Sequence, residues 1–80
     1  MRLAVKLPTV ESAHQFCAAA SRFEQDIDVK YRHYTLDAKS VLGVQSIPRN
    51  ELLEVFIHNV DLQKTNLQEI LEAFKPFEVK

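Results

Sequence analysis

Three segments of the chain alternate apolar and polar residues one by one, and this alternation constrains the fold more than any other feature. The segments read RLAVKL (2–7), DIDVKYR (26–32) and ELLEVFIHN (51–59). Such alternation predicts β-strands with one face in the core and the other in water. Because each strand carries charged residues on its second face, helices on both sides of the sheet would bury unpaired charges. The sequence therefore predicts a sheet that is covered on one face only.

Helical spacing appears after the first strand. Pro8 ends that strand, and Thr9 is a residue type that caps helix N-termini well. From Val10 to about Phe23 the apolar residues recur three and four positions apart, which is the spacing of one helix face. We therefore expect a helix over this stretch, with Cys17 as a small hydrophobic residue on its buried face.

A short apolar run near the middle of the chain contains Gly43, the only glycine. Ser40 can cap a helix here, and Pro48 forbids helical geometry at Ile47. We therefore expect one or two helical turns over residues 40–46.

The last part of the chain predicts a third helix. Its apolar side chains follow the i, i+3, i+4, i+7 rule over residues 67–74. Asp61 or Thr65 is the expected cap of this helix, and Pro76 stops it.

The segment HYTLD (33–37) is expected to form a short partner strand after a tight turn near Arg32 and His33. The order is then strand, helix, strand, strand, short helix, strand, helix. Together with the one-sided strands, this order predicts an α+β open-faced sandwich with helices on one face of an antiparallel sheet. Eighty residues have room for one hydrophobic core, so residues 1–80 are expected to form a single domain.

Charge and composition argue against several classes of partner. Ten basic and eleven acidic residues are interleaved along the chain, whereas nucleic-acid binding needs a clustered basic face. No stretch approaches the ~18 apolar residues that a membrane span requires. The single cysteine cannot form an internal disulfide, so a reducing compartment fits. We expect a cytoplasmic protein that binds neither nucleic acid nor membranes.

The chain also shows no arrangement typical of catalysis. His14, His33, His58 and Cys17 lack the paired spacing of metal ligands. There is no nucleophile–base pair and no glycine-rich phosphate loop. We therefore expect no metal, no cofactor and no enzymatic activity.

The segment AKSVLGVQSI (38–47), together with the element order, resembles the histidine-containing phosphocarrier protein family (HPr) of the bacterial sugar phosphotransferase system. ASRFEQDIDV (20–29) also resembles the end of the first helix and the second strand of that family. The resemblance covers nearly the whole chain and implies a four-stranded antiparallel sheet covered by three helices. The matching residues of the first segment are Lys39, Ser40, Val41, Leu42, Gly43, Val44, Ser46 and Ile47.

The phosphoryl-accepting motif of that family, Gly-Leu-His-Ala-Arg-Pro-Ala, is not matched. An ungapped register places LPTVESA (7–13) on it, with Thr9 at the His, Glu11 at the Arg and Ser12 at the Pro. A hydroxyl without an activating base is a far weaker nucleophile than an imidazole. A carboxylate at Glu11 also repels the phosphoryl group that a guanidinium would hold. The resemblance therefore implies a degenerate site without phosphoryl transfer.

The resemblance implies two further features of the short helix. In Gram-positive members an ATP-dependent regulatory kinase phosphorylates the serine that matches Ser40, next to Lys39; the alternative is that Ser40 only caps the helix. Exposed aliphatic residues of this helix form a docking surface in the family. The candidate partner-binding residues are Lys39, Val41, Leu42, Val44 and Ile47. About half of the aliphatics are expected to be exposed, with Leu42 the preferred surface residue.

Three functional hypotheses stay open from the sequence. The first is a regulatory, protein-binding module that binds phosphotransferase-system or regulatory proteins, including a serine kinase, through the Ser40 helix. The second is an active phosphocarrier that uses His14, five residues late, as the acceptor. The third is a structural homodimer or subunit, for which Phe56 on the exposed sheet face and Tyr34 on the neighbouring hairpin are candidate contacts.

Overall fold

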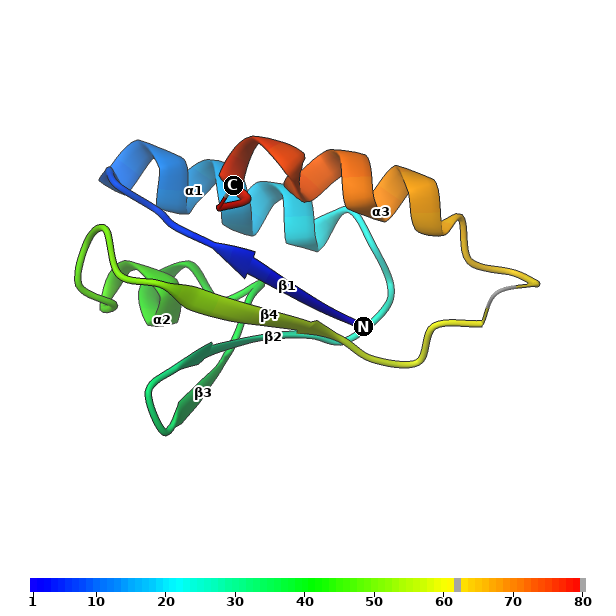
Figure 1. Ribbon diagram of the computed structural model, residues 1–80, viewed down its shortest axis with the longest axis horizontal. Helices are drawn as coiled ribbons and strands as arrows, with labels where there is room; N and C mark the ends of the chain where they lie inside the picture. Colours follow the sequence, from blue (N-terminus) through cyan, green and yellow to red (C-terminus); the bar gives the residue numbers. More distant parts are fainter. Residues whose placement is uncertain (62, 80) are drawn as a thin grey trace.

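The computed structural model, which describes residues 1–61 and 63–79, contains the predicted elements in the predicted order (Figure 1). A 3₁₀ turn, Lys75–Phe77, follows the last helix. The strands and helices are β1 (Arg2–Val5), α1 (Val10–Ser21), β2 (Ile27–Tyr31), β3 (Tyr34–Asp37), α2 (Val41–Gln45), β4 (Leu53–Ile57) and α3 (Leu67–Phe74).

The four strands form one antiparallel sheet in the order β1-β4-β2-β3. α1 and α3 lie side by side over one face, while α2 lies at the end of the sheet, in contact with α1 and β3 (Figure 1). The open-faced sandwich expected from the alternating strands is confirmed. No helix within residues 1–61 and 63–79 is both long and apolar enough to cross a membrane.

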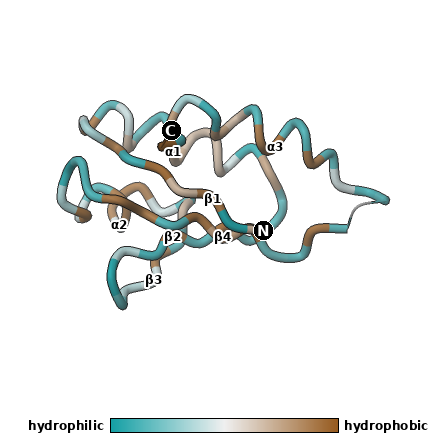
Figure 2. Tube along the Cα trace, viewed as in Figure 1, coloured by the Kyte–Doolittle hydropathy of each residue, from teal (hydrophilic) through white to brown (hydrophobic). Residues whose placement is uncertain are grey.

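The core lies between the sheet and the helices. The central strands bury every second residue, including Val29 and Val55, which lie opposite each other in neighbouring strands. Phe16 of α1 packs against Phe74 of α3, with the ring centroids 5.3 Å apart, and against the edge of Phe77 at 5.6 Å. Figure 2 shows hydrophobic and hydrophilic positions alternating along α3. The cluster of Phe16, Phe74 and Phe77 joins α1 and α3 over one face of the sheet.

Two of the expected helix caps are correct and one is wrong. Thr9 and Ser40 are the N-caps of α1 and α2, as predicted. For α3 the cap is Asn66, whose side chain accepts a hydrogen bond from the Glu69 amide at 3.2 Å. The two residues expected in its place instead close the preceding turn, where the Thr65 amide donates to the Asp61 carbonyl. Asp61 and Thr65 thus belong to the turn before α3 rather than to its cap.

The two edges of the sheet differ. Along β1 the C-terminal segment pairs with the strand: the Val79 amide donates to the Ala4 carbonyl at 3.0 Å, and the Lys6 amide donates to the Phe77 carbonyl at 3.0 Å. Val5 lies opposite Glu78 in this pairing. On the other side, β3 pairs with β2 alone, and no described strand adjoins its outer edge.

The expected pairing of Phe56 with Tyr34 in a dimer contact is wrong. Phe56 lies opposite Asp28 on the face of the sheet that the helices leave open. Tyr34 lies opposite Tyr31, on the face that carries α2, and lines a groove with Ile47. The two aromatic residues therefore lie on opposite faces and cannot belong to one flat contact.

Candidate functional site

The first turn of α1 is closed by its own side chains. The Ser12 amide donates to Thr9 Oγ1 at 3.0 Å, and the Thr9 amide donates to Ser12 Oγ at 3.0 Å. The Ser12 hydroxyl in turn donates to the Thr9 carbonyl at 2.7 Å. This reciprocal capping box satisfies two amide donors at the helix start, where an anion would otherwise bind. Both hydroxyls are held in the cap, and neither contacts a base that would activate it.

Glu11 brings negative charge to the same turn. Its side chain is exposed, and one carboxylate oxygen accepts a hydrogen bond from the side-chain amide nitrogen Nε2 of Gln15 at 3.4 Å. A carboxylate in the first turn stabilises the helix through its dipole. The same charge repels a phosphate group at this position.

Arg49 ties the end of α2 to the start of α1, and the sequence interpretation did not identify this role. Its Nη2 donates to the carbonyls of Val44 at 3.1 Å and Gln45 at 3.2 Å, and also to that of Ile47. Its Nη1 donates to the Thr9 carbonyl at 3.3 Å. A basic residue just after a helix is a known C-terminal capping signal. The link to α1 spans 40 residues and leaves no local signal.

His14 lies away from the helix start. It is the fifth residue of α1, so its own amide belongs to the helix ladder rather than to the free first turn. The ring is exposed, and its Nε2 lies 2.8 Å from Nε2 of Gln45 on α2. The two nitrogens lie within hydrogen-bond distance, and their donor and acceptor roles depend on the tautomer of His14. The contact joins the two helices at the surface.

Ser40 is exposed and caps α2 with a single bond, in which its Oγ accepts from the Gly43 amide at 3.3 Å. A Cβ at Gly43 would lie only 3.2 Å from this oxygen, which explains why glycine fits here. The neighbouring Lys39 directs its ammonium to the Phe23 carbonyl at 2.6 Å, near the end of α1. The lysine that adjoins Ser40 in sequence therefore has its charge engaged elsewhere.

The aliphatic residues of α2 divide as the sequence predicted. Val44 and Ile47 are buried, whereas Val41 and Leu42 retain 44% and 81% of their surface. Leu42 is the most exposed large hydrophobic residue of the described chain. Two of the four aliphatic docking candidates, Val44 and Ile47, thus belong to the core.

The exposed residues of α1 and α2 form one continuous surface. On α1, Val10 is 52% exposed and lies four positions before His14, so both share a helix face. On α2, Val41 and Leu42 lie four and three positions before Gln45 and share its face. The His14–Gln45 contact joins the two faces. We call Val10, His14, Val41, Leu42 and Gln45 the α1–α2 surface.

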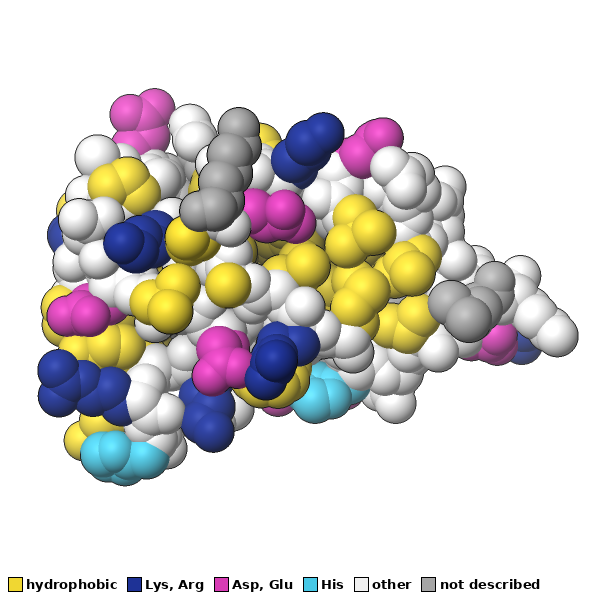
Figure 3. Space-filling view, viewed as in Figure 1, with side chains coloured by type: hydrophobic (Ala, Val, Ile, Leu, Met, Phe, Trp, Pro, Cys, Tyr) yellow, Lys and Arg dark blue, Asp and Glu magenta, His cyan; other side chains and the backbone are white. Residues whose placement is uncertain are grey.

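Hydrophobic side chains also gather between α3 and the start of β1 (Figure 3). Leu3, in β1, is only partly exposed and packs against the core. Met1 is 43% exposed. This second apolar area is therefore more closely joined to the core than the α1–α2 surface.

Cys17 does not have the environment of a reactive thiol. It is buried, and its Sγ lies 3.9 Å from the Ser40 carbonyl. Burial, and secondarily the negative charge of Asp37, raise the pKa of this thiol. The protonated thiol is thus favoured, as expected for a buried small hydrophobic residue.

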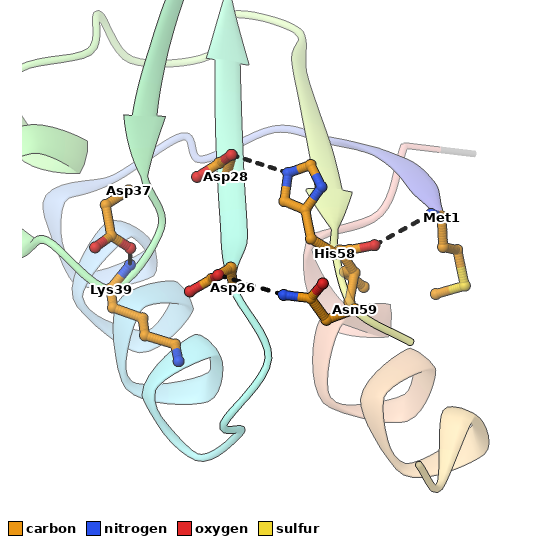
Figure 4. A network of polar contacts seen from close by, with 8 residues as sticks. Met1, Asp26, Asp28, Asp37, Lys39, His58 and Asn59 are labelled. Atoms are coloured by element: carbon orange, nitrogen blue, oxygen red, sulfur yellow. Dashed lines mark hydrogen bonds and ion pairs between the residues drawn. The ribbon is translucent and has the colours of Figure 1, made fainter. Parts of the chain in front are cut away.

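Polar residues at one end of the sheet lie in hydrogen-bonded pairs (Figure 4). His58 Nε2 lies 2.9 Å from a carboxylate oxygen of Asp28. The side-chain nitrogen Nδ2 of Asn59 donates to a carboxylate oxygen of Asp26 at 3.5 Å. Within the described residues no three His, Cys, Asp or Glu side chains are placed to hold a metal ion. An exposed pair of this kind contributes little to stability.

No protein-family model and no curated protein matches the chain. Several solved structures are similar to it, and two of them are HPr proteins. The phosphocarrier protein HPr from Bacillus anthracis str. Ames has a TM-score of 0.70 and 25% identity, over 99% of this chain and 94% of that chain. HPr-C-His from Thermoanaerobacter tengcongensis has a TM-score of 0.69 and 16% identity, over 94% of this chain and 91% of that chain. The similarity extends over nearly the full length of both structures.

Proposed function

We propose that this chain, whose fold is that of HPr phosphocarrier proteins, is a regulatory protein-binding module of the phosphotransferase system. It docks through the α1–α2 surface and transfers no phosphoryl group at Thr9. Its partners are phosphotransferase-system or regulatory proteins. The cytoplasmic location expected from the sequence stays a prediction.

The exposure of Leu42 is the observation that carries this proposal. A leucine that keeps 81% of its surface contributes almost nothing to the fold it belongs to. Val10 and Val41 extend the apolar area on the joined helix faces. Exposed apolar residues on two helix faces that a polar contact joins are typical of a protein contact.

The chemistry at the start of α1 supports binding without phosphoryl transfer. Thr9 and Ser12 use their hydroxyls to cap the helix, and Glu11 adds a negative charge. A phosphohistidine carrier needs the opposite arrangement, with a ring nitrogen as nucleophile and donors free to hold the dianion.

One other acceptor remains as an alternative. His14 is exposed, and its imidazole contacts the side-chain amide of Gln45 through Nε2. It lies within the helix rather than at its start, so amide donors that would stabilise a phosphoryl group are absent there.

The first experiment tests phosphoryl transfer. The protein is incubated with phosphoenolpyruvate and the first kinase of the phosphotransferase system, with an active HPr as the positive control. We expect no acid-labile, base-stable phosphate on this chain. Acid-labile phosphate that disappears in His14→Ala would replace the binding module with a carrier, and acid-stable phosphate that disappears in Thr9→Ala would overturn the site interpretation.

The second experiment tests docking. Isotope-labelled protein is titrated with the same kinase, and amide resonances are followed by NMR. We expect shifts confined to the α1–α2 surface and their loss in Leu42→Glu. Leu52→Glu is the matched control, because Leu52 is also an exposed leucine, at 56%, but lies outside α1 and α2. Absence of any shift, or equal loss in both variants, would contradict docking through this surface.

Regulation at Ser40 is tested separately. We propose that a serine kinase of the HPr system phosphorylates the exposed Ser40 hydroxyl with ATP, which adds charge at the edge of the docking surface. The expected product is an acid-stable phosphate that is lost in Ser40→Ala. Ser46→Ala keeps it, because the Ser46 hydroxyl donates to the Gly43 carbonyl at the other end of α2. Failure of this modification would leave docking intact as a separate result.

A further inference from the structure

We infer that β3 of one molecule pairs antiparallel with β3 of a second copy of this chain, so that two four-stranded sheets join into one. Thr35 lies at the centre of the pairing, opposite Thr35 of the second copy. This inference concerns a different edge of the molecule from the proposed docking surface and does not depend on it.

The backbone of β3 is available for such pairing. The Ala38 amide donates to the Ile27 carbonyl, so Ala38 directs its backbone toward β2. Since this direction alternates along an antiparallel strand, Thr35 and Asp37 direct their amides to the open edge. No described residue of the chain donates to or accepts from the Thr35 backbone on that side. A second antiparallel strand satisfies these groups.

β3 has no proline, lysine or bulge at its edge; its shortness and the charged Asp37 at its end are the protection it does carry. Such strands are commonly blocked by proline, by lysine or by a bulge. β3 reads YTLD, which combines an aromatic, a β-branched and an aliphatic residue, and it pairs with β2 without a bulge. The opposite edge, β1, is covered by the chain's own C-terminal segment. The protein thus closes one edge and leaves the other open.

The charges of the hairpin are self-complementary. Arg32 and His33 precede β3 and Asp37 ends it, so an antiparallel copy places the basic turn of each molecule against the Asp37 of the other. Figure 3 shows basic and histidine side chains at this end of the molecule. Asp37 lies directly opposite Asp28; its carboxylate accepts a hydrogen bond from the Lys39 backbone amide at 2.9 Å, and none of the ion pairs of the described residues includes it. Asp28 already contacts His58, so a basic side chain of the second copy supplies a partner for Asp37.

The register centred on Thr35 agrees with these charges and with the apolar residues. It places His33 opposite Asp37, and Tyr34 opposite Leu36, in both halves of the dimer. Tyr34 is 57% exposed, and it borders an apolar groove of about 220 Å³. The lining residues of this groove are Tyr31, Tyr34, Leu36, Ser46, Ile47 and Pro48. The second copy's tyrosine therefore covers the open side of the groove.

A single strand edge and one groove make a small interface, so the dimer is weak and depends on concentration. Sedimentation velocity from about 10 µM to about 1 mM is expected to show the mass rising from one chain to two. A mass that stays at one chain over this whole range would overturn the inference.

Variants of Thr35 test the backbone pairing. Thr35→Pro removes the outward amide, which the monomer's own ladder does not use, and it is expected to abolish the dimer. Thr35→Ala keeps the amide and is expected to dimerise. Circular dichroism checks that both variants fold. A dimer that persists in folded Thr35→Pro would place the contact elsewhere and refute pairing through β3.

Charge variants provide a test that does not disturb the strand. His33→Glu places a carboxylate opposite Asp37 of the second copy and is expected to weaken dimerisation about fivefold or more. His33→Lys is expected to strengthen it, and this gain is expected to disappear in high salt. Equal dimerisation of the two variants would contradict the proposed register.

Hydrogen exchange supplies a residue-level readout. The Thr35 amide is expected to exchange more slowly as the protein concentration rises. The Ala38 amide is the internal control, because it is already bonded to Ile27 in each molecule. Exchange at Thr35 that is independent of concentration would overturn the pairing.

Discussion

The helices α1 and α2 lie next to each other but are held in different ways. α1 has 12 residues and is anchored along its length by a buried face that includes Phe16 and Cys17. α2 has five residues, of which Val44 alone is buried, and Arg49 holds its end through three carbonyls. An isolated helix of five residues is not stable in water.

This difference separates scaffold from contact surface. The stability of α1 comes from burial, so its exposed residues can change with little effect on the fold. The position of α2 depends on a few contacts with its neighbours, and these contacts leave its outer face free. A partner that binds Leu42 and Val41 therefore meets a helix whose orientation is already fixed by Val44 and Arg49.

The largest expected effect concerns the buried residues of the two helices. Phe16→Ala removes a ring that contacts Phe74 and Phe77 and is expected to lower the free energy of unfolding by about 3–5 kcal/mol. Val44→Ala removes a smaller side chain and is expected to cost about 2 kcal/mol. Urea denaturation followed by circular dichroism measures both. An equal cost for the two variants would show that α2 anchors the core as strongly as α1.

Arg49→Ala tests how α2 is held. Loss of hydrogen bonds from a charged donor to the α2 carbonyls is expected to cost about 1–2 kcal/mol. In Arg49→Ala the backbone amides of α2 are expected to exchange hydrogen faster, while the amides in the middle of α1 stay protected. Lys6→Ala, which removes another exposed cation, is the control and is expected to change stability by less than about 0.5 kcal/mol. Uniform loss of protection in both helices would contradict a local role for Arg49.

The two N-caps give a smaller effect. Thr9→Ala breaks the reciprocal capping box of a long helix and is expected to cost about 1 kcal/mol. Ser40→Ala removes one hydrogen bond from a short helix and is expected to cost about 0.5 kcal/mol. Thermal unfolding of both variants gives the order. A greater loss in Ser40→Ala would mean that the short helix depends on its cap more than on Val44 and Arg49.

The smallest effect concerns pH. Burial raises the pKa of the Cys17 thiol, so the unfolded chain loses this proton first as the pH rises. The contribution of the thiol to stability is complete below the ordinary thiol pKa and is lost above about pH 9. When the pH is raised from neutral to alkaline, the free energy of unfolding of Cys17→Ala is expected to fall less than that of the parent chain. Urea denaturation at each pH measures this difference. Parallel curves for the two proteins would show that the thiol titrates alike in both states.

The local rules of the sequence determined most of the fold. Alternation along the strands is a property of neighbouring residues, and it was sufficient to predict a sheet covered on one face. Thr9 and Ser40 were recognised as caps because a cap acts on amides within three residues of itself. The expectation that about half of the aliphatics near the short helix are exposed, with Leu42 as the preferred surface residue, came from the family resemblance and is confirmed.

Other features depended on which segments the tertiary structure brings together. The α3 cap is Asn66 because Asp61 and Thr65 close a turn of their own. Phe56 and Tyr34 lie on opposite sheet faces because facing depends on strand register, which the pattern within one strand does not give.

The long-range partners of the polar side chains also came only from the tertiary structure. His14 meets Gln45, and Arg49 meets the Thr9 carbonyl, across 31 and 40 residues of chain. Lys39 turns to the end of α1. Local sequence fixes the period of a helix or strand, because those bonds span a few residues. The partner of a long polar side chain depends on packing between distant segments, so it is decided only when the whole chain folds.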